Sequence, residues 1–164
     1  MTTIERVYFA LKLFSTLGSG LIAGAFFAFS VFVMSALARL PASQGMTAMQ
    51  SINITVLNPI FLGVFMGTAL SCLILAVNAL LRWSQPGTAF LLAASLLYLI
   101  GTFLVTVIFN VPLNDALAAA KPNTPEGAQL WAKYLSQWTM WNHVRTLAAL
   151  ASLASFIMAL VRAP

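Results

Sequence analysis

The chain has 164 residues, of which 61% are hydrophobic and only 7% are charged, and its mean hydropathy is +0.95. Ordinary soluble domains carry about 25% charged residues, so this composition excludes them and indicates a protein that lives in the lipid bilayer. The basic residues outnumber the acidic ones by eight to three but are scattered singly, which argues against nucleic-acid binding. A lone cysteine, Cys72, excludes both a disulfide framework and a cysteine metal site.

Four apolar stretches are each long enough for a helix to cross the bilayer, which takes about 20 residues. They predict one domain over 1–164, an all-α integral membrane four-helix bundle. Its spans are expected at about 8–38, 58–82, 87–110 and 138–162. The first stretch could be taken for a signal peptide, but its apolar run exceeds the 7–15 residues typical of one, so we interpret it as a retained span.

Four spans place both termini and the short loop at 82–87 on one side of the membrane. That side carries Arg6, Lys12, Arg82 and Arg162 in short segments, whereas the other side carries Arg39, Lys121, Lys133 and Arg145 in longer ones. Basic residues in short segments favour the cytoplasmic side. We therefore expect a bacterial inner (cytoplasmic) membrane protein with both termini in the cytoplasm.

The two loops on the opposite side are predicted to form short interfacial helices. In the first, apolar and amide residues recur at helical spacing at Met46, Met49, Ile52, Asn53 and Val56. In the second, 113–120 looks helical and Thr124-Pro125 has the form of a helix start. The amphipathic face that follows, at 130–138, lies in the interface or runs on into the fourth span.

Small residues are spaced by four in the first two spans, at Gly20 and Gly24 and at Gly63 and Gly67. This spacing lets helix backbones approach closely in lipid. It predicts contact within the bundle, with contact between copies in a homo-oligomer as the alternative.

Polar residues are expected to gather at one end of the bundle. Span two opens with Asn58-Pro59, a capping residue followed by proline, and span three is expected to end at Asn110 because Pro112 interrupts the helix. The alternating chain direction then brings together Asn53, Asn58, Asn110, Asn114, Asp115, Asn142, His143 and Arg145. Amide groups, an arginine and helix N-termini in that region could stabilise an oxyanion. The asparagines could equally be caps and turn formers.

The single histidine, His143, is a candidate general base or a ligand for a metal or haem; otherwise it is an interfacial side chain bonded to a carbonyl. A protein-held metal site is otherwise poorly supplied, since no cysteine or carboxylate pair lies nearby. Arg145 could clamp an oxyanion, reach lipid headgroups or pair with Asp115. If the segment is helical, His143 and Arg145 diverge by about 200° around the axis. Trp138 and Trp141 could stack on an aromatic ligand or form an interfacial belt.

Five segments together resemble the anthrone oxygenase-like family of small four-span membrane proteins. They are 24–30 (Gly-Ala-Phe-Phe-Ala-Phe-Ser), 49–53 (Met-Gln-Ser-Ile-Asn), 58–59 (Asn-Pro), 110–114 (Asn-Val-Pro-Leu-Asn) and 141–146 (Trp-Asn-His-Val-Arg-Thr). Fungal members oxidise anthrones to anthraquinones with molecular oxygen, without a conventional flavin or nicotinamide. The resemblance implies a site lined by Asn110, Asn114, Asn142, His143 and Arg145.

On this basis the sequence predicts an oxygenase for a lipophilic aromatic molecule such as an anthrone or a quinol. His143 would act as base, and Arg145 with the asparagines would hold the oxyanion, with Asn53, Asn58, Asp115, Trp138 and Trp141 as further substrate contacts. No cofactor is predicted. The alternatives are a haem- or metal-dependent redox protein with His143 as ligand, and a non-enzymatic module that binds lipid or a partner protein.

Overall fold

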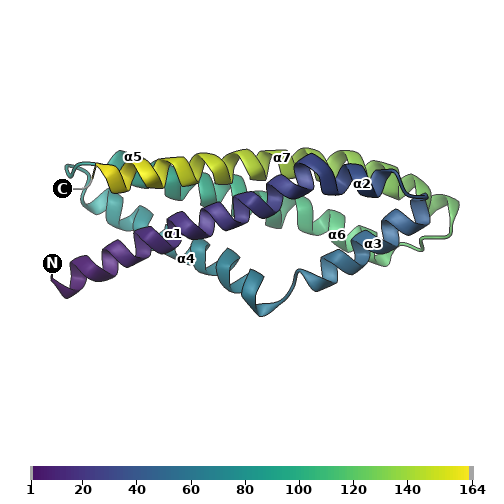
Figure 1. Ribbon diagram of the computed structural model, residues 1–164, viewed down its shortest axis with the longest axis horizontal. Coiled ribbons are helices and arrows are strands. Elements are labelled where there is room, and N and C mark those ends of the chain that lie inside the picture. The colour runs from purple at the N-terminus through teal and green to yellow at the C-terminus, as the bar shows by residue number, and fades with distance from the viewer. Residues whose placement is uncertain (1, 163–164) are drawn as a thin grey trace.

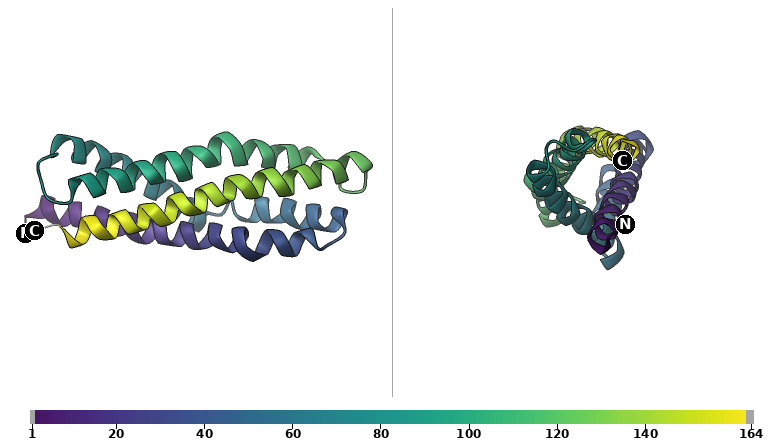
Figure 2. Two further views of the ribbon diagram at one scale, coloured as in Figure 1. Left: turned by 90° about the horizontal axis from the view of Figure 1, so that it is seen from above. Right: turned by 90° about the vertical axis from the view of Figure 1, so that its left-hand side faces the viewer.

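The computed structural model describes residues 2–162 and, within them, contains helices and no strands. Four helical rods run antiparallel, with both termini at one end (Figures 1 and 2). The first rod consists of α1 (Thr3–Ala28), the π-helix η1 (Phe29–Val33) and α2 (Met34–Ala38). The second is α4 (Pro59–Leu81), preceded by α3 (Ala42–Thr55). The third consists of α5 (Thr88–Leu96), η2 (Leu97–Leu104), η3 (Thr106–Asn110) and α6 (Val111–Ala119), and the fourth is α7 (Pro125–Val161).

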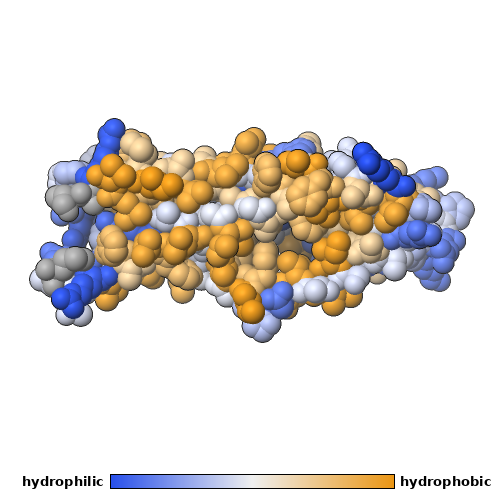
Figure 3. Space-filling view, viewed as in Figure 1, coloured by the Kyte–Doolittle hydropathy of each residue, from blue (hydrophilic) through white to orange (hydrophobic). Residues whose placement is uncertain are grey.

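All four rods are long and apolar enough to cross a membrane, at Thr3–Ala38, Pro59–Leu81, Thr88–Ala119 and Pro125–Val161. Their exposed surface is largely hydrophobic, and hydrophilic residues gather at both ends of the molecule (Figure 3). The protein is therefore an integral membrane four-helix bundle, as predicted.

The rods differ in length, and this difference shapes the molecule. α4 has 23 residues and spans about 35 Å, whereas the 37 residues of α7 span about 55 Å. Three rods thus extend beyond the end of α4, and α3 packs against α2, α6 and α7 in the space beside them (Figure 1). The bundle thus has two parts. In the membrane-length half, α4 packs with the first and third rods, and in the extension α3 packs with those two rods and with α7.

Local signals for helix starts were read correctly. Asn58 accepts hydrogen bonds from the amides of Ile60 and Phe61, at 3.1 and 3.0 Å. Thr124 accepts one from Gly127 at 3.1 Å. Both caps are followed by proline at the first helical turn, where its missing N–H costs nothing.

The prediction that Pro112 ends the third span was wrong. The helix continues through it to Ala119, and Asn110 keeps helical dihedrals of −82° and −39°. Immediately before the proline the chain is in the π-helix η3, and the amide of Val111 bonds to Thr106 five residues back. The wider turn relieves the clash that proline causes in a regular helix. The second predicted interfacial helix is therefore the end of the third rod, and 125–138 is the start of the fourth.

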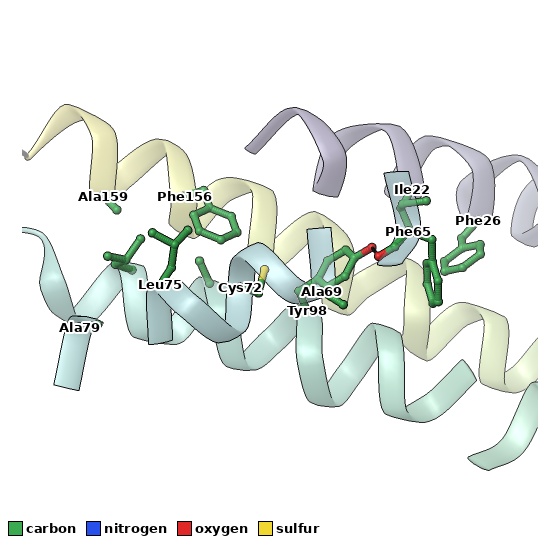
Figure 4. Packing of buried hydrophobic residues seen from close by; sticks show 12 residues of the cluster. Ile22, Phe26, Phe65, Ala69, Cys72, Leu75, Ala79, Tyr98, Phe156 and Ala159 are labelled. Atoms are coloured by element: carbon green, nitrogen blue, oxygen red, sulfur yellow. Dashed lines mark hydrogen bonds between the residues drawn. The ribbon is translucent and has the colours of Figure 1, made fainter. Parts of the chain in front are cut away.

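The bundle contains two separate hydrophobic cores. The first lies in the membrane-length half, where Ile22, Phe65, Leu75, Tyr98 and Phe156 pack together (Figure 4). The second lies in the extension and consists of Met34, Leu37, Met46, Met49, Leu117, Trp131, Tyr134 and Trp138. Because Met46 and Met49 are buried there, α3 is a core element of the extension and not merely a surface helix.

The small-residue motifs divide between the inside and the outside of the bundle. A Cβ at Gly20 would touch Leu153, and one at Gly67 would touch Phe14, so these two glycines face neighbouring helices. A Cβ at Gly24 or Gly63 would meet no atom within 4 Å. The contact between copies that these two positions could provide stays a prediction.

Candidate functional site

A layer of buried polar side chains separates the two hydrophobic cores. Along α7, the second core ends at Trp138 and the first resumes further on, with Asn142 and Arg145 between them. The first and third rods repeat this order. We call the whole group the polar layer: Ser30, Thr102, Thr106, Asn110, Asn142, Arg145 and Thr146. The polar layer thus lies at the depth where the membrane-length half ends, and it contains the buried amide and guanidinium groups of Asn110, Asn142 and Arg145.

The π-helical segments supply every residue of the layer that does not come from α7. Ser30 lies in η1, Thr102 in η2, and Thr106 and Asn110 in η3. A π turn holds more residues than an α turn and so shifts the direction of the side chains that follow. In this protein the irregular turns aim short polar side chains from two rods at α7.

Arg145 is the centre of the layer and is only 3% exposed. Its Nη2 donates to Asn142 Oδ1 at 2.7 Å and its Nη1 to Thr106 Oγ1 at 3.3 Å. The guanidinium carbon lies 4.1 Å from the centroid of the Phe26 ring and 5.0 Å from that of Trp138. Contact with ring faces and neutral oxygens stabilises the cation but leaves its charge uncompensated.

Asn142 ties the arginine to the first rod. It is fully buried, and its Nδ2 donates to the Phe26 carbonyl and to Ser30 Oγ, both at 2.8 Å. Ser30 in turn lies 3.0 Å from the hydroxyl of Thr146. With both N–H donors of its amide used, Asn142 presents its oxygen to Arg145 in one orientation.

No carboxylate balances Arg145. The chain has only three acidic residues, Glu5, Asp115 and Glu126, and all are exposed. The alternative in which Arg145 pairs with Asp115 is therefore not what the structure shows. A buried cation without a counter-ion is expensive in a membrane protein, which makes Arg145 the first candidate for a functional residue.

Three buried polar atoms of the site have no hydrogen-bond partner among the described residues. Two are donors, Nε of Arg145 and Nε1 of Trp138, and one is an acceptor, Oδ1 of Asn110. The amide of Asn110 is otherwise engaged, since its Nδ2 donates to the Trp138 carbonyl at 3.2 Å. Buried polar groups are rarely left unpaired, so unpaired donors beside an uncompensated cation indicate a place for a ligand oxygen.

A second polar network lies in the extension. The Tyr134 hydroxyl donates to Asn114 Oδ1 at 2.8 Å and accepts from Asn53 Nδ2 at 3.5 Å. Gln50 donates to the carbonyls of Leu117 and Ala120. Asn53 and Asn114 thus lie close together, on either side of the Tyr134 hydroxyl. Neither of them bonds to Arg145, whose side-chain hydrogen bonds go to Asn142 and Thr106.

The remaining predicted residues lie apart from the layer. His143 is exposed, about 200° around α7 from Arg145, so the divergence expected for a helix is confirmed. Its role as a base stays a prediction. Asn58 and Asp115 are exposed, while Trp141 stacks on Phe109 with ring centroids 3.7 Å apart. Within residues 2–162, no group of three or more His, Cys, Asp or Glu side chains could hold a metal ion.

Sequence reasoning missed several residues that complete the site. Ser30 and Phe26 were seen only as part of a motif and Tyr134 only as part of an amphipathic face, and Thr102 and Thr106 were not singled out. A signal did exist for the threonines, because Thr102, Thr106 and Asn110 recur at a spacing of four in an otherwise apolar run. That spacing places them on one face of a helix.

Comparison with known proteins identifies the family of the chain. A family model described as anthrone oxygenase matches residues 59–155, which is more than half of the chain and includes Asn110, Asn142 and Arg145. No curated protein and no solved structure matches the chain. The chain belongs to the anthrone oxygenase family.

Proposed function

We propose that this protein is a membrane oxygenase that converts a lipophilic aromatic substrate of the anthrone or quinol type with molecular oxygen. The observation that carries the proposal is Arg145, a buried cation without a counter-ion that lies between two aromatic rings. Family membership supports the same chemistry. The site is best suited to a flat aromatic molecule on which negative charge develops at an oxygen.

The proposed reaction proceeds through an enolate. The CH₂ group of an anthrone loses a proton, and the remaining charge moves to the carbonyl oxygen on the opposite side of the central ring. The enolate carbon then gives its electron pair to O₂, and one proton completes a hydroperoxide. Cleavage of the O–O bond with loss of the second C–H proton releases water and leaves a carbonyl. One oxygen atom of O₂ thus enters the product and the other leaves as water.

Arg145 stabilises the step in which charge forms. A guanidinium in a desolvated site interacts with an oxyanion much more strongly than it would in water. Its free Nε–H and the Trp138 indole N–H can donate to substrate oxygen atoms, and Asn110 Oδ1 can accept from a phenolic hydroxyl. The ring faces of Phe26 and Trp138 hold the guanidinium in place.

In this proposal the polar layer stabilises the charge of the enolate. None of its residues accepts the proton that the substrate loses. The three carboxylates and His143 are all exposed, so in this mechanism the substrate proton passes to water. The earlier assignment of His143 as base is a rival within the same reaction. The two are separated by a His143→Ala variant.

The test is oxygen uptake by the purified protein with an anthrone, together with the absorbance of the quinone formed. We expect turnover in the parent and a loss of about 100-fold or more in kcat/KM for Arg145→Met, the usual effect of removing one oxyanion donor. Arg145→Lys keeps the charge but not the planar set of donors, and should fall between the two. Parent-level turnover in Arg145→Met would end the proposal.

Binding is measured separately, so that a slow reaction is not mistaken for an empty site. A hydroxyanthraquinone titrated into the protein should quench tryptophan fluorescence, since Trp138 lies beside Arg145. Arg145→Met should weaken this binding. An absorption spectrum and metal analysis of the same preparation test the alternative: a band or a stoichiometric metal that disappears in His143→Ala would favour the redox protein with His143 as ligand.

For location we propose the bacterial inner membrane with cytoplasmic termini, supported by the short basic segments at Arg6, Lys12, Arg82 and Arg162. The only native cysteine, Cys72, is fully buried, so a cysteine introduced in a loop would be the one labelled. Ser84→Cys should react with a membrane-impermeant reagent in inverted vesicles. Labelling of Ser84→Cys in intact cells would reverse the orientation.

A further inference from the structure

A cavity of about 690 Å³ opens at the end of the bundle that carries the termini, far from the polar layer. It lies between the first turns of α1, the loop from α4 to α5 and the last turns of α7. Its polar lining includes Lys12, Arg82, Tyr8, Glu5 and Thr88. Nothing in the proposed oxygenase chemistry uses this cavity.

Lys12 is an unusual residue for its position. It lies in an apolar run of α1 and is only 9% exposed, yet it lines the cavity. Its ammonium lies 5.0 Å from the centroid of the Tyr8 ring, and among the described residues no hydrogen bond or ion pair holds it. A lysine at this depth needs an anionic partner or an aqueous surface to be tolerated.

Arg82 and the start of α5 add positive potential to the same cavity. Arg82 follows the last residue of α4, and α5 begins at Thr88 after Gly87, whose φ of 80° suits glycine. The cavity includes Gly87 and Thr88, so the positive end of the α5 dipole faces it. The basic side chains and the N-terminus of α5 thus favour the binding of an anion in the cavity.

One carboxylate also lines the cavity and must be counted. Glu5 belongs to the capping box of α1, where its Oε2 accepts from the Thr2 amide at 2.8 Å. Against it stand Lys12 and Arg82 inside the cavity. The cavity therefore retains net positive charge.

The depth of the cavity indicates where the anion comes from. Trp83, next to Arg82, is 59% exposed, and exposed tryptophans mark the headgroup level of a bilayer. Phe9 and Leu160, which also line the cavity, belong to the apolar surface of the bundle. A molecule held there is in contact with both a basic pocket and the acyl chains of the bilayer.

We propose that this cavity binds the phosphate group of an anionic membrane phospholipid through Lys12 and Arg82, with its acyl chains along the apolar helices. A phospholipid and a soluble phosphate ester both carry the phosphate group that this cavity would bind. The lipid is favoured over a soluble anion because the cavity lies at headgroup depth. This site is independent of the oxygenase proposal.

The test measures phospholipid binding to the delipidated protein in detergent, by native mass spectrometry and by the shift in Tm. The probes are phosphatidylglycerol, zwitterionic phosphatidylcholine and soluble glycerol phosphate. The variant is Lys12→Gln with Arg82→Gln. The matched control is Arg39→Gln with Lys133→Gln, which removes two exposed charges from the opposite end of the bundle.

We expect the parent and the control to prefer phosphatidylglycerol to phosphatidylcholine. The variant should bind phosphatidylglycerol more weakly by about fivefold for each basic residue removed. If the double variant does not fold, Arg82→Gln alone, at an exposed position, should show the single fivefold loss. Parent-level binding in the variant would overturn the proposal. Equal competition by glycerol phosphate would also overturn it, because the site would then take soluble anions.

Discussion

Replacing Asn142 with aspartate tests whether the charge of Arg145 is available to substrate. The side chain keeps its shape, but its oxygen, which lies 2.7 Å from Arg145 Nη2, becomes part of a carboxylate. The guanidinium then gains the internal counter-ion that it lacks in the parent. An oxyanion on the substrate would have to compete with that ion pair.

The effect on folding should be small because opposing terms nearly cancel. At 2.7 Å the two charges attract by about 6 kcal/mol with an effective dielectric constant of about 20. Against this stand several kcal/mol for burying a carboxylate. Losing the bonds from Asn142 Nδ2 to Phe26 and Ser30 costs about 1 kcal/mol each. We expect unfolding free energy to change by less than about 2 kcal/mol, while kcat/KM falls by about 100-fold or more.

The assay compares oxygen uptake with an anthrone and the Tm of the same detergent preparation. Asn123→Asp is the matched control, since it makes the same change of charge at an exposed loop position. A lower Tm with lost activity would indicate general damage rather than a neutralised arginine. The reasoning is refuted if Asn142→Asp turns over substrate within about threefold of the parent, because an oxyanion donor is worth far more than that.

The structure supports four further predictions. His143→Ala should leave kcat/KM within about twofold, because the ring faces outward; a loss as large as the 100-fold typical of general-base removal would restore it as the base. Gly18→Ala should lower the unfolding free energy by about 1–3 kcal/mol, since the added methyl overlaps the hydroxyl of Thr68 on α4. Gly63→Ala, with no atom within 4 Å, should be neutral or stabilise by up to about 1 kcal/mol, and a change in particle mass would instead identify a contact between copies. Asn58→Ala should cost about 1 kcal/mol through loss of the α4 cap, and an unchanged Tm would show that the proline alone suffices.

Much of the fold could be predicted because its determinants are local. Apolar length alone predicts the spans, since every backbone polar group in lipid must be satisfied within its own helix. Asn58 and Thr124 mark helix starts because the capping oxygen, the backbone amides it serves and the following proline are all close in sequence. The divergence of His143 and Arg145 follows from helix geometry in the same way.

The candidate site was only partly predictable, because its chemistry depends on groups far apart in the chain. Asn110, Asn142 and Arg145 were named from sequence, and all three lie in the polar layer. Their division from Asn53 and Asn114 was not foreseen. Whether an asparagine caps a helix or bonds to an arginine depends on which rod lies beside it, and residue type does not record that.

Composition, apolar length and capping residues by themselves determined an integral membrane four-helix bundle. Only the tertiary structure decided that Pro112 continues a helix, since that depends on the π turns of η3 before it. It also decided that Arg145 is buried between Phe26 and Trp138 without a counter-ion while His143 faces outward. The physical reason is that helix propensity and hydrophobicity act over a few residues, whereas desolvation of a charge depends on every element packed around it.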